Sequence, residues 1–378
     1  MKKTIAFILA MGLICVPICN AAPTSAAENQ DVSASETVLA QLEKGNLVER
    51  TTEDGTGVYY VDADGNLITN ETVLYEDTIY YFCESGYGLP YKVHKVNDHI
   101  TGVVDAASDT MYVITGSEKA LVIDTMVGTG NVKEMVELLT DLPYDVVLTH
   151  GHVDHIGGIF DFDNVYLSEA DQSMIENEAR PENEMGYFFG STQYGDVVIT
   201  EESGLVGEND FTAYSSDTKL AAANDGDVFD LGDGYTAELI SVPGHTDGSM
   251  AILFLQDRIL LTGDSVNNYT YLQLNENATI ESYRESLLKL KERDDEWDNL
   301  LFSHNNAELF PKTTIDDCIE LCDEIMETNG ECGISMADMG YDEDIMLAAE
   351  VDWEKFCRPD GKTGNIVYRK SQIFNTQN

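Results

Sequence analysis

The 378-residue sequence predicts an α/β protein of two similar halves, in which two sheets pack face to face and helices cover the outside. From about residue 100 the sequence alternates strand-like and helical patterns, and the second half repeats that order. In both halves, strands end in histidine or aspartate. Apolar residues make up 43% of the chain, which suffices for a packed core at this length.

Residues 1–27 are typical of a cleavable secretory signal. Lys2 and Lys3 precede an apolar stretch that ends in small residues. Pro17 and Asn20 interrupt this stretch before it reaches the roughly 20 residues that a membrane-spanning helix needs. Because no second long apolar run follows, we expect a secreted protein with no stable insertion into a membrane.

Residues 28–99 are expected to form a linker and a small β-rich extension. The segment 57–68 alternates apolar and polar residues around Asp64 and Gly65, which favours a hairpin. The segment 73–82 fits two further short strands. No catalytic pattern is seen here, and its many tyrosines are more often packing residues than ligand contacts.

Residues 100–310 form the expected main domain. The strand-like runs of its first half are 111–115, 120–125 and 145–150, and the helix between the last two has an apolar face of Val132, Met135, Leu138 and Leu139. The strand-like runs of its second half are 236–242, 250–255, 258–264 and 300–304, and the helix before the last has an apolar face of Ile280, Tyr283, Leu287 and Leu290. We expect the functional site where these strands end.

Residues 311–378 are expected to form a C-terminal helical extension, with a turn and an edge strand within 360–369. A predicted helix over 313–327 ends before Gly330 and carries Cys318 and Cys322 on its apolar face. Five cysteines lie outside the signal, so a monomer keeps at least one unpaired thiol. Core packing is the simplest role for Cys318 and Cys322. The alternative is a disulfide with Cys332 or Cys357.

The formal charge of −48 excludes some classes of partner. With 69 acidic against 21 basic residues, the chain has no general attraction for nucleic acid or for anionic membranes. No local basic patch compensates. We therefore expect a small-molecule substrate and no nucleic-acid partner, while an oligomeric state does not follow from the sequence.

Three histidines fall within six residues of one another. His150, His152 and His155 stand in a segment that also holds Asp154 and ends in a glycine pair. Alternate residues of such a loop can face one metal ion and the next two residues a second ion. A structural role is the alternative. The cluster would contribute little to packing, because clustered histidines repel one another when protonated and need hydrogen-bond partners when buried.

Three further candidates end strands later in the chain: His245, Asp264 and His304. A single histidine in such a place is more often a hydrogen-bonded structural residue. The metal prediction therefore depends mainly on the three-histidine cluster. His94 and His99 lie outside the pattern and are expected to be structural.

In order and spacing, the segments THGHVDHIGG, PGHTDGS, TGD and SH resemble the metallo-β-lactamase fold superfamily of metallo-hydrolases. The resemblance covers about residues 100–305 and implies an αββα sandwich of two mixed sheets, with a dinuclear metal site in a groove at one edge. It implies His150, His152 and His245 as ligands of a first ion, Asp154, His155 and His304 as ligands of a second, and Asp264 as the bridge. Asp124 matches the acid that braces the ligand loop, and a strand-end turn is its alternative role.

The aspartate at position 264 reduces the number of branches of the superfamily that the sequence resembles. The broadest group of zinc β-lactamases has a cysteine there, whereas an aspartate is similar to the glyoxalase II, lactonase and nuclease branches. The negative charge of the chain argues against a nuclease.

We therefore expect a secreted hydrolase that cleaves a small-molecule ester, thioester or lactone. Two divalent ions that share a water lower its pKa and hold a hydroxide beside an electrophilic carbonyl. Zinc fits the histidine-rich set, and iron or manganese would be tolerated. Asp154 is the candidate to orient the water and to move its proton. The alternatives are a β-lactam amide, a small phosphodiester or, in another class, a metal-binding protein without turnover.

Residues that bind the substrate are not identified by spacing. The insert from residue 161 to about residue 233 and the loop after Asp264 carry aromatic side chains, which could line an apolar substrate or pack the loops. These are Tyr187, Phe188, Phe189, Tyr194, Tyr269 and Tyr271.

Overall fold

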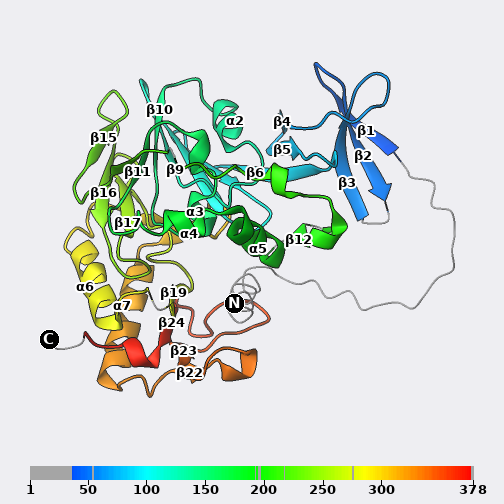
Figure 1. Ribbon diagram of the computed structural model, residues 1–378. Helices are drawn as coiled ribbons and strands as arrows, with labels where there is room; N and C mark the ends of the chain where they lie inside the picture. The colour runs from blue at the N-terminus through cyan, green and yellow to red at the C-terminus, as the bar shows by residue number, and fades with distance from the viewer. Residues whose placement is uncertain are drawn as a thin grey trace.

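The computed structural model describes residues 36–52, 55–191, 193–194, 197–216, 218–274 and 276–375. The expected secretory signal, residues 1–27, lies outside these described residues. Figure 1 shows the main body with strands β15 to β17 at one end and a small separate sheet, β1 to β3, at the other. Within the described ranges, no helix combines the length and the apolar character that crossing a membrane requires.

The larger sheet has nine strands in the order β14-β11-β10-β9-β8-β7-β6-β5-β4. Pairing is antiparallel from β4 to β9 and parallel from β9 to β14, so the sheet is mixed. Its strands are β4 (Glu71–Tyr75), β5 (Thr78–Phe82), β6 (Gly88–Lys95), β7 (Ile100–Val104), β8 (Thr110–Thr115), β9 (Ala120–Ile123), β10 (Tyr144–Val147), β11 (Val165–Leu167) and β14 (Leu220–Ala222).

The second sheet has six strands in the order β15-β16-β17-β18-β20-β21. Its strands are β15 (Val228–Asp230), β16 (Thr236–Ser241), β17 (Met250–Phe254), β18 (Ile259–Leu261), β20 (Asn299–Leu301) and β21 (Phe310–Pro311). One buried cluster joins Ile114 and Leu121 of the first sheet to Leu239 and Ile252 of the second. The two sheets therefore pack face to face, because alternate side chains of each strand point to this shared core.

Helices cover the outer face of each sheet. They are α2 (Val132–Glu137), α3 (Val153–Ile156), α4 (Ile175–Glu178), α5 (Pro181–Ser191), α6 (Ile280–Lys291) and α7 (Thr313–Glu327), with short 3₁₀ turns η1 (Ile159–Asp161), η2 (Glu201–Ser203), η3 (Glu208–Asp210), η4 (Ala337–Met339) and η5 (Lys370–Gln372). Apolar residues of α2 to α5 share a core with the nine-stranded sheet, and those of α6 and α7 share one with the six-stranded sheet. The expected αββα sandwich is confirmed.

The helices expected around Ile280 and over 313–327 are confirmed as α6 and α7, and both bury the face that their apolar periodicity predicts. The first helix differs from the expectation. It ends at Glu137, and Leu138, which the pattern placed on its buried face, is 40% exposed. Val136 is buried instead, because the short helix turns a different face to the sheet.

The sheet does not end at residue 99, where the sequence suggested a domain boundary. Strands β4 to β6 pair onward to β7 and extend the nine-stranded sheet. They do so because Tyr81, Leu89 and Tyr91 bury their side chains in the same core as the helices α2 to α5. The separate sheet consists of β1 (Glu36–Gln41), β2 (Asn46–Thr52) and β3 (Gly55–Val61). The hairpin expected at 57–68 is reduced to a bridge between Val61 and Leu67.

The described part of the C-terminal extension is less helical than expected, with three strands after α7 where the sequence suggested one edge strand within 360–369. After α7, strands β22 (Ile334–Ser335), β23 (Ile345–Leu347) and β24 (Ile366–Arg369) join β19 (Thr270–Leu272) in a sheet of order β19-β24-β23-β22. A two-stranded sheet, β12 (Gln193–Tyr194) and β13 (Val197–Val198), lies in the insert. Cys318 and Cys322 are buried on α7, and each of the five cysteines described is a free thiol.

Candidate metal centre

Seven polar side chains that follow the strands β10, β16, β18 and β20 meet at one edge of the sandwich. They form two clusters, and within each cluster one nitrogen or oxygen atom per residue lies within 4.8 Å of the others. The three-histidine group consists of His150, His152 and His245. The mixed group consists of Asp154, His155, Asp264 and His304. The structure thus brings together all seven residues that the sequence proposed as ligands.

In the three-histidine group, hydrogen bonds hold the outward nitrogens of His245 and His150. Nδ1 of His245 lies 2.7 Å from the carbonyl oxygen of Tyr271, to which it donates. Nδ1 of His150 lies 3.0 Å from Oγ1 of Thr149. Because that hydroxyl donates its own proton to Asp124 at 2.8 Å, it accepts from His150. Both rings therefore keep an Nε2 lone pair for the site.

The two histidines of the mixed group also use Nδ1 for a hydrogen bond to another side chain. Nδ1 of His155 donates to Oδ2 of Asp124 at 2.9 Å, and Nδ1 of His304 donates to Oδ1 of Asp109 at 3.1 Å. His152 is turned the other way, with Nε2 3.8 Å from Oε1 of Glu276. With Nδ1 bonded in this way, His155 and His304 can offer Nε2 to a metal ion, and His152 would offer Nδ1.

Acceptor atoms face one another across both groups. Nδ1 of His152 lies 2.9 Å from Nε2 of His245. In the mixed group, Nε2 of His304 lies 3.1 Å from Oδ2 of Asp264 and 3.4 Å from Oδ2 of Asp154. Two lone pairs at such distances repel, so either a proton or a metal ion has to lie between the two atoms of each pair. Neutral imidazole and carboxylate are also the ligands that divalent metals prefer, so the residues fit metal ions.

Buried atoms without a protein partner support this fit. Among the described residues, Nε2 of His150, Nε2 of His155 and Oδ1 of Asp264 are shielded from solvent and have no hydrogen-bond partner. Leaving such atoms unpaired costs free energy, which ligation to an ion would recover. Asp264 also joins the groups, because its Oδ2 lies 3.7 Å from Nε2 of His245 and 3.7 Å from Nε2 of His155.

The histidines differ in the direction of their pKa shifts. Burial opposes protonation of His152, but its contact with Glu276 and the charges of nearby acids outweigh burial and raise its pKa. Burial, followed by the neighbouring imidazoles, lowers the pKa of His150 well below its usual range and that of His245 to about 4. Burial also opposes protonation of His155 and His304, but the charges of Asp154 and Asp264, respectively, outweigh it and raise both pKa values. The mixed group therefore attracts positive charge, whether a proton or a metal ion supplies it.

Asp124 lies where the sequence expected a brace for the ligand loop. Its carboxylate is fully buried and accepts from the backbone N–H of Thr149 at 2.7 Å, from His155 and from the hydroxyl of Ser303 at 3.3 Å. Its φ of 59° is rare for a residue other than glycine, and such conformations persist where the surroundings enforce them. Asp124 thus ties the loop of His155 to the residue that precedes His304.

Asp171 is a second brace, which the sequence did not reveal. Its carboxylate accepts from the backbone N–H groups of Gly151 at 3.0 Å and Gly248 at 2.8 Å, and from the hydroxyl of Thr246 at 2.7 Å. A Cβ at Gly248 would lie 2.5 Å from Cγ of Asp171, so this approach requires glycine. Asp171 therefore joins the two loops that carry the three-histidine group. Asp109 and Glu276 were missed as well, because no motif marks any of the three.

The aromatic residues proposed as a substrate wall have mixed roles. Phe188 is fully buried among the helices, and Tyr269 packs with the C-terminal strands, so both are packing residues. Tyr271 is partly buried in the same cluster as Tyr269, and Phe189 packs against the helices. The side chain of Tyr194 lies outside the described residues. Tyr187 contacts the mixed group, since its hydroxyl lies 2.9 Å from Oδ2 of Asp154.

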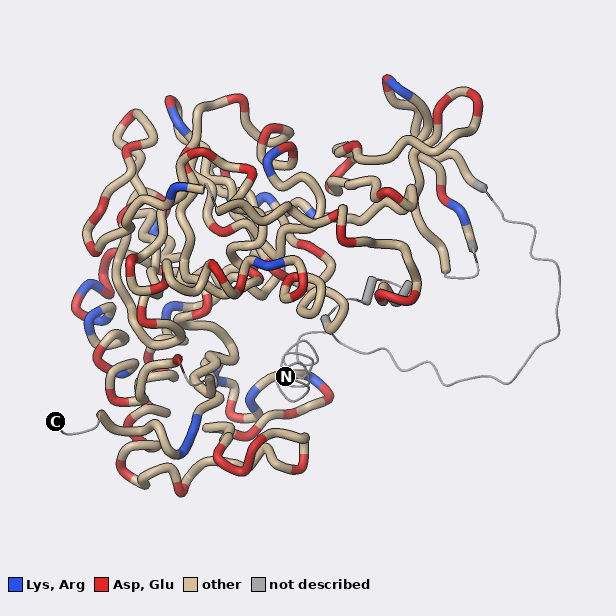
Figure 2. The backbone as a smooth tube through the Cα atoms, in the orientation of Figure 1, with Lys and Arg blue, Asp and Glu red and all other residues tan. Residues whose placement is uncertain are grey.

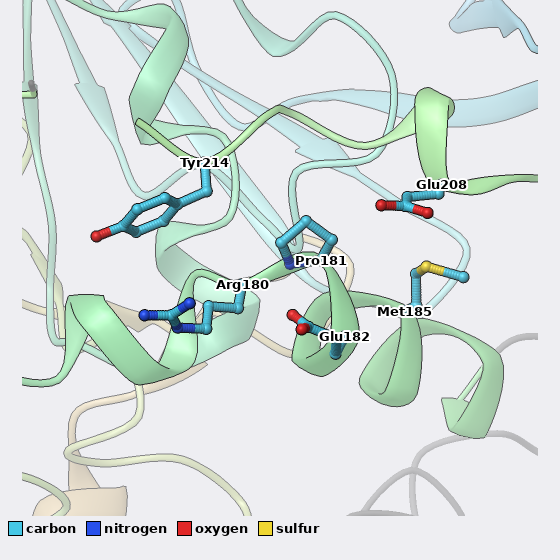
Figure 3. A pocket seen from close by; sticks show the side chains of 6 residues that line it. All are labelled: Arg180, Pro181, Glu182, Met185, Glu208 and Tyr214. Atoms are coloured by element: carbon cyan, nitrogen blue, oxygen red, sulfur yellow. The ribbon is translucent and has the colours of Figure 1, made fainter. Parts of the chain in front are cut away.

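A pocket of about 310 Å³ lies at the beginning of α5 (Figure 3). The guanidinium of Arg180 there lies 5.3 Å from the ring centre of Tyr214. Its lining consists of Arg180, Pro181, Glu182, Met185, Glu208 and Tyr214. Because none of these residues belongs to either ligand group, we assign the chemistry to the strand ends and not to this pocket.

A sandwich with two such groups at its edge is the arrangement of a metallo-hydrolase. The model of the metallo-beta-lactamase superfamily matches residues 105–304, which are 200 of the 378 residues. The chain belongs to this superfamily.

Individual relatives match less than half of this chain, at identities of 31% and 32%. The acyl-coenzyme A thioesterase MBLAC2 of Homo sapiens is 32% identical over 170 residues, which are 41% of this chain and 57% of the relative. A metallo-beta-lactamase fold-containing protein of Sulfurisphaera tokodaii is 31% identical over 175 residues, 42% of this chain and 58% of the relative. The chain therefore spans little more than half the length of these relatives. Among solved structures, the metallo-beta-lactamase from Pontibacter korlensis is 18% identical with a TM-score of 0.43, over 61% of this chain and 97% of that one.

Proposed function

We propose that this protein is a secreted hydrolase that cleaves a small-molecule thioester, ester or lactone at a centre of two divalent ions. The observation that carries the proposal is the pair of ligand groups, in which hydrogen bonds already hold the outward nitrogens of four histidines. Zinc suits a set rich in neutral imidazole, and the carboxylates would also accept iron or manganese.

The proposed ligands divide as the two groups do. The first ion would be held by Nε2 of His150, Nδ1 of His152 and Nε2 of His245, the second by Asp154, His155 and His304, and Asp264 would lie between them. When bound, two such ions supply Lewis acidity and lower the pKa of a water that they share.

Asp154 is the residue we propose to move the proton. Its Oδ2 lies within 3.5 Å of Nε2 of His155 and 3.4 Å of Nε2 of His304, at the side of the mixed group. A carboxylate in this place can accept a proton from the attacking water and pass it to the leaving oxygen or sulfur. No serine or cysteine nucleophile is required.

Thioesters come first among the substrates because the human and bovine relatives, 32% and 31% identical, are named acyl-coenzyme A thioesterases. The charge of this chain restricts the choice further. Acidic residues occur along the whole backbone in Figure 2, and Glu276 lies beside His152. A polyanionic carrier would be repelled by a net charge of −48, so we favour neutral or cationic thioesters and esters.

Secretion is part of the proposal and depends on the sequence of residues 1–27. Expression of the full chain with its natural leader, followed by intact-mass analysis of the culture medium, tests it. We expect a product that lacks about the first 21 to 27 residues. Full-length protein retained in the cells would contradict secretion without affecting the proposed chemistry.

Metal analysis and a substrate panel test the chemistry. The panel comprises a neutral acyl thioester, an acyl-coenzyme A, a chromogenic ester, a lactone and a cephalosporin. We expect two ions per chain and turnover of the neutral thioester or ester that a chelator abolishes and zinc restores. His152→Ala should lose metal and activity, whereas His94→Ala, at an exposed histidine far from the ligand groups in sequence, should keep both. Fewer than one ion per chain, or turnover that survives chelation, would contradict the proposal.

A further inference from the structure

Two residues close the side of the mixed group that faces α5. The hydroxyl of Tyr187, on α5, lies 2.9 Å from Oδ2 of Asp154 and 3.1 Å from Oδ1 of Asp109. Oδ1 of Asp109 in turn lies 3.1 Å from Nδ1 of His304. These contacts form a chain, Asp154 to Tyr187 to Asp109 to His304, that begins and ends on members of the same ligand group.

Proton counting sets the direction of the two hydrogen bonds that end on the ligands Asp154 and His304. An Asp154 that ligates a metal is ionised and can only accept, so the single phenolic proton of Tyr187 goes to it at the shorter of the two contacts. A His304 that ligates through Nε2 carries its proton on Nδ1 and donates it to Asp109. Tyr187 thus holds Oδ2 of Asp154, and Asp109 holds Nδ1 of His304.

Tyr187 and Asp109 are both held in rigid surroundings. Asp109 is fully buried in the turn between β7 and β8, where Oδ1 of Asp105 accepts from the backbone N–H groups of Ala107 at 2.8 Å and of Asp109 at 3.0 Å. The helix α5 that carries Tyr187 packs against α3, the helix of Asp154 and His155. Phe188, next to Tyr187, anchors α5 because its ring is buried against Phe211.

We propose that Tyr187 and Asp109 are positioning residues for the second metal ion, Tyr187 by fixing Oδ2 of Asp154 and Asp109 by fixing the ring and tautomer of His304. This inference rests on the proposed dinuclear centre. Residues that hydrogen-bond to metal ligands typically change metal affinity by about 10- to 100-fold. Neither residue has a hydrogen bond to the three-histidine group in the part of the chain that the structure describes, so the effect should be confined to the second ion.

Calorimetric titration of the metal-free protein with Zn²⁺ tests the proposal. Tyr187→Phe removes one oxygen atom and keeps the ring, and Tyr214→Phe, in the same insert but beside Arg180, is the matched control. In Tyr187→Phe we expect the second equivalent to bind about 10-fold more weakly and the first to bind as in the wild type. Asp109→Asn should weaken the second equivalent by at least as much. Tyr214→Phe should titrate like the wild type.

A second readout uses Co²⁺ in place of Zn²⁺, because the visible absorption of cobalt reports its ligand geometry. Tyr187→Phe should change the spectrum that appears with the second equivalent and leave that of the first unchanged. The ratio kcat/KM on the best substrate of the panel should fall mainly through kcat, since Asp154 is the proposed proton carrier.

The outcomes separate this inference from the proposed function. A wild-type protein that binds fewer than two ions would overturn both. If the wild type binds two ions and Tyr187→Phe gives the same titration and the same cobalt spectrum, only the positioning role is overturned. A lower melting temperature with an unchanged titration would assign Tyr187 to folding alone and overturn it equally. Should Asp109→Asn fail to fold, Tyr187→Phe decides the question.

Discussion

Asp124 and His155 are joined by a buried hydrogen bond of 2.9 Å between Oδ2 and Nδ1. This bond leaves Nε2 of His155 as the only ring atom available to the mixed group, so the tautomer of a proposed ligand is set by a residue 31 positions earlier in the chain.

Asp124→Asn should therefore weaken metal binding. The amide cannot accept from both Thr149 and His155 through two oxygens, and it leaves a buried group unpaired, which costs about 1–3 kcal/mol of stability. We expect metal affinity to fall by about 10- to 100-fold, measured by competition with a chromogenic chelator. Asp163→Asn, at an exposed acid, should bind metal normally. Equal affinities in the two variants would show that Asp124 does not brace the ligand.

The variants Asp264→Ala and His304→Ala should retain different numbers of metal ions. Oδ2 of Asp264 lies within 3.7 Å of ligand nitrogens in both groups, whereas His304 faces the mixed group only. Asp264→Ala should therefore lose most of both ions, and His304→Ala should keep about one ion per chain. Elemental analysis of the purified variants measures this. Two ions retained in Asp264→Ala would rule out the bridging role.

Glu184 should make stability depend on pH. It is fully buried on α5, neither carboxylate oxygen has a partner among the described residues, and burial, followed by the charge of Glu182, raises its pKa to about 9. The folded state therefore holds a proton that the unfolded state loses near pH 4.5. Stability falls as the pH rises from about 4.5 to about 9 and levels off above that.

Glu184→Gln removes this dependence, so its melting temperature should exceed that of the wild type at pH 9 by several degrees and approach it at pH 5. Glu202→Gln, at an exposed position of the same insert, is the control and should follow the wild type at both pH values. A difference between Glu184→Gln and wild type that does not change with pH would contradict the assignment.

Ionic strength should separate substrates by charge. Salt screens the repulsion between the acidic chain and an anionic thioester, so kcat/KM for an acyl-coenzyme A should rise by about 3- to 10-fold between about 0.05 M and about 0.5 M salt. A neutral thioester should show little change. Faster turnover of the anionic substrate at low ionic strength would mean that the site is locally positive enough to outweigh the surface.

The sequence indicated part of the candidate site because that part of the signal is local. His150, His152, Asp154 and His155 lie in one loop, and the helices α6 and α7 carry a clear apolar period. The contacts that hold the candidate ligands in place could not be predicted in this way. Asp171 and Gly248 are 77 positions apart, and Tyr187 and Asp109 are 78 apart, so only the folded chain brings them together.

Strand pairing was predicted less well than strand positions. The segment 73–82 marks β4 and β5 as strands, but it does not say that they pair, through β6, with the main sheet. The C-terminal strands β22 to β24 have two to four residues each, which is too short for a period to emerge. Their pairing with β19 depends on long-range contacts.

The central claim is a centre of two metal ions, and a crystal structure with anomalous diffraction data at the zinc edge tests it most directly. We predict two anomalous peaks per chain, one among His150, His152 and His245 and one among Asp154, His155 and His304, with Asp264 in contact with both. The absence of any peak in zinc-loaded crystals, or peaks bound only by other residues, would contradict it.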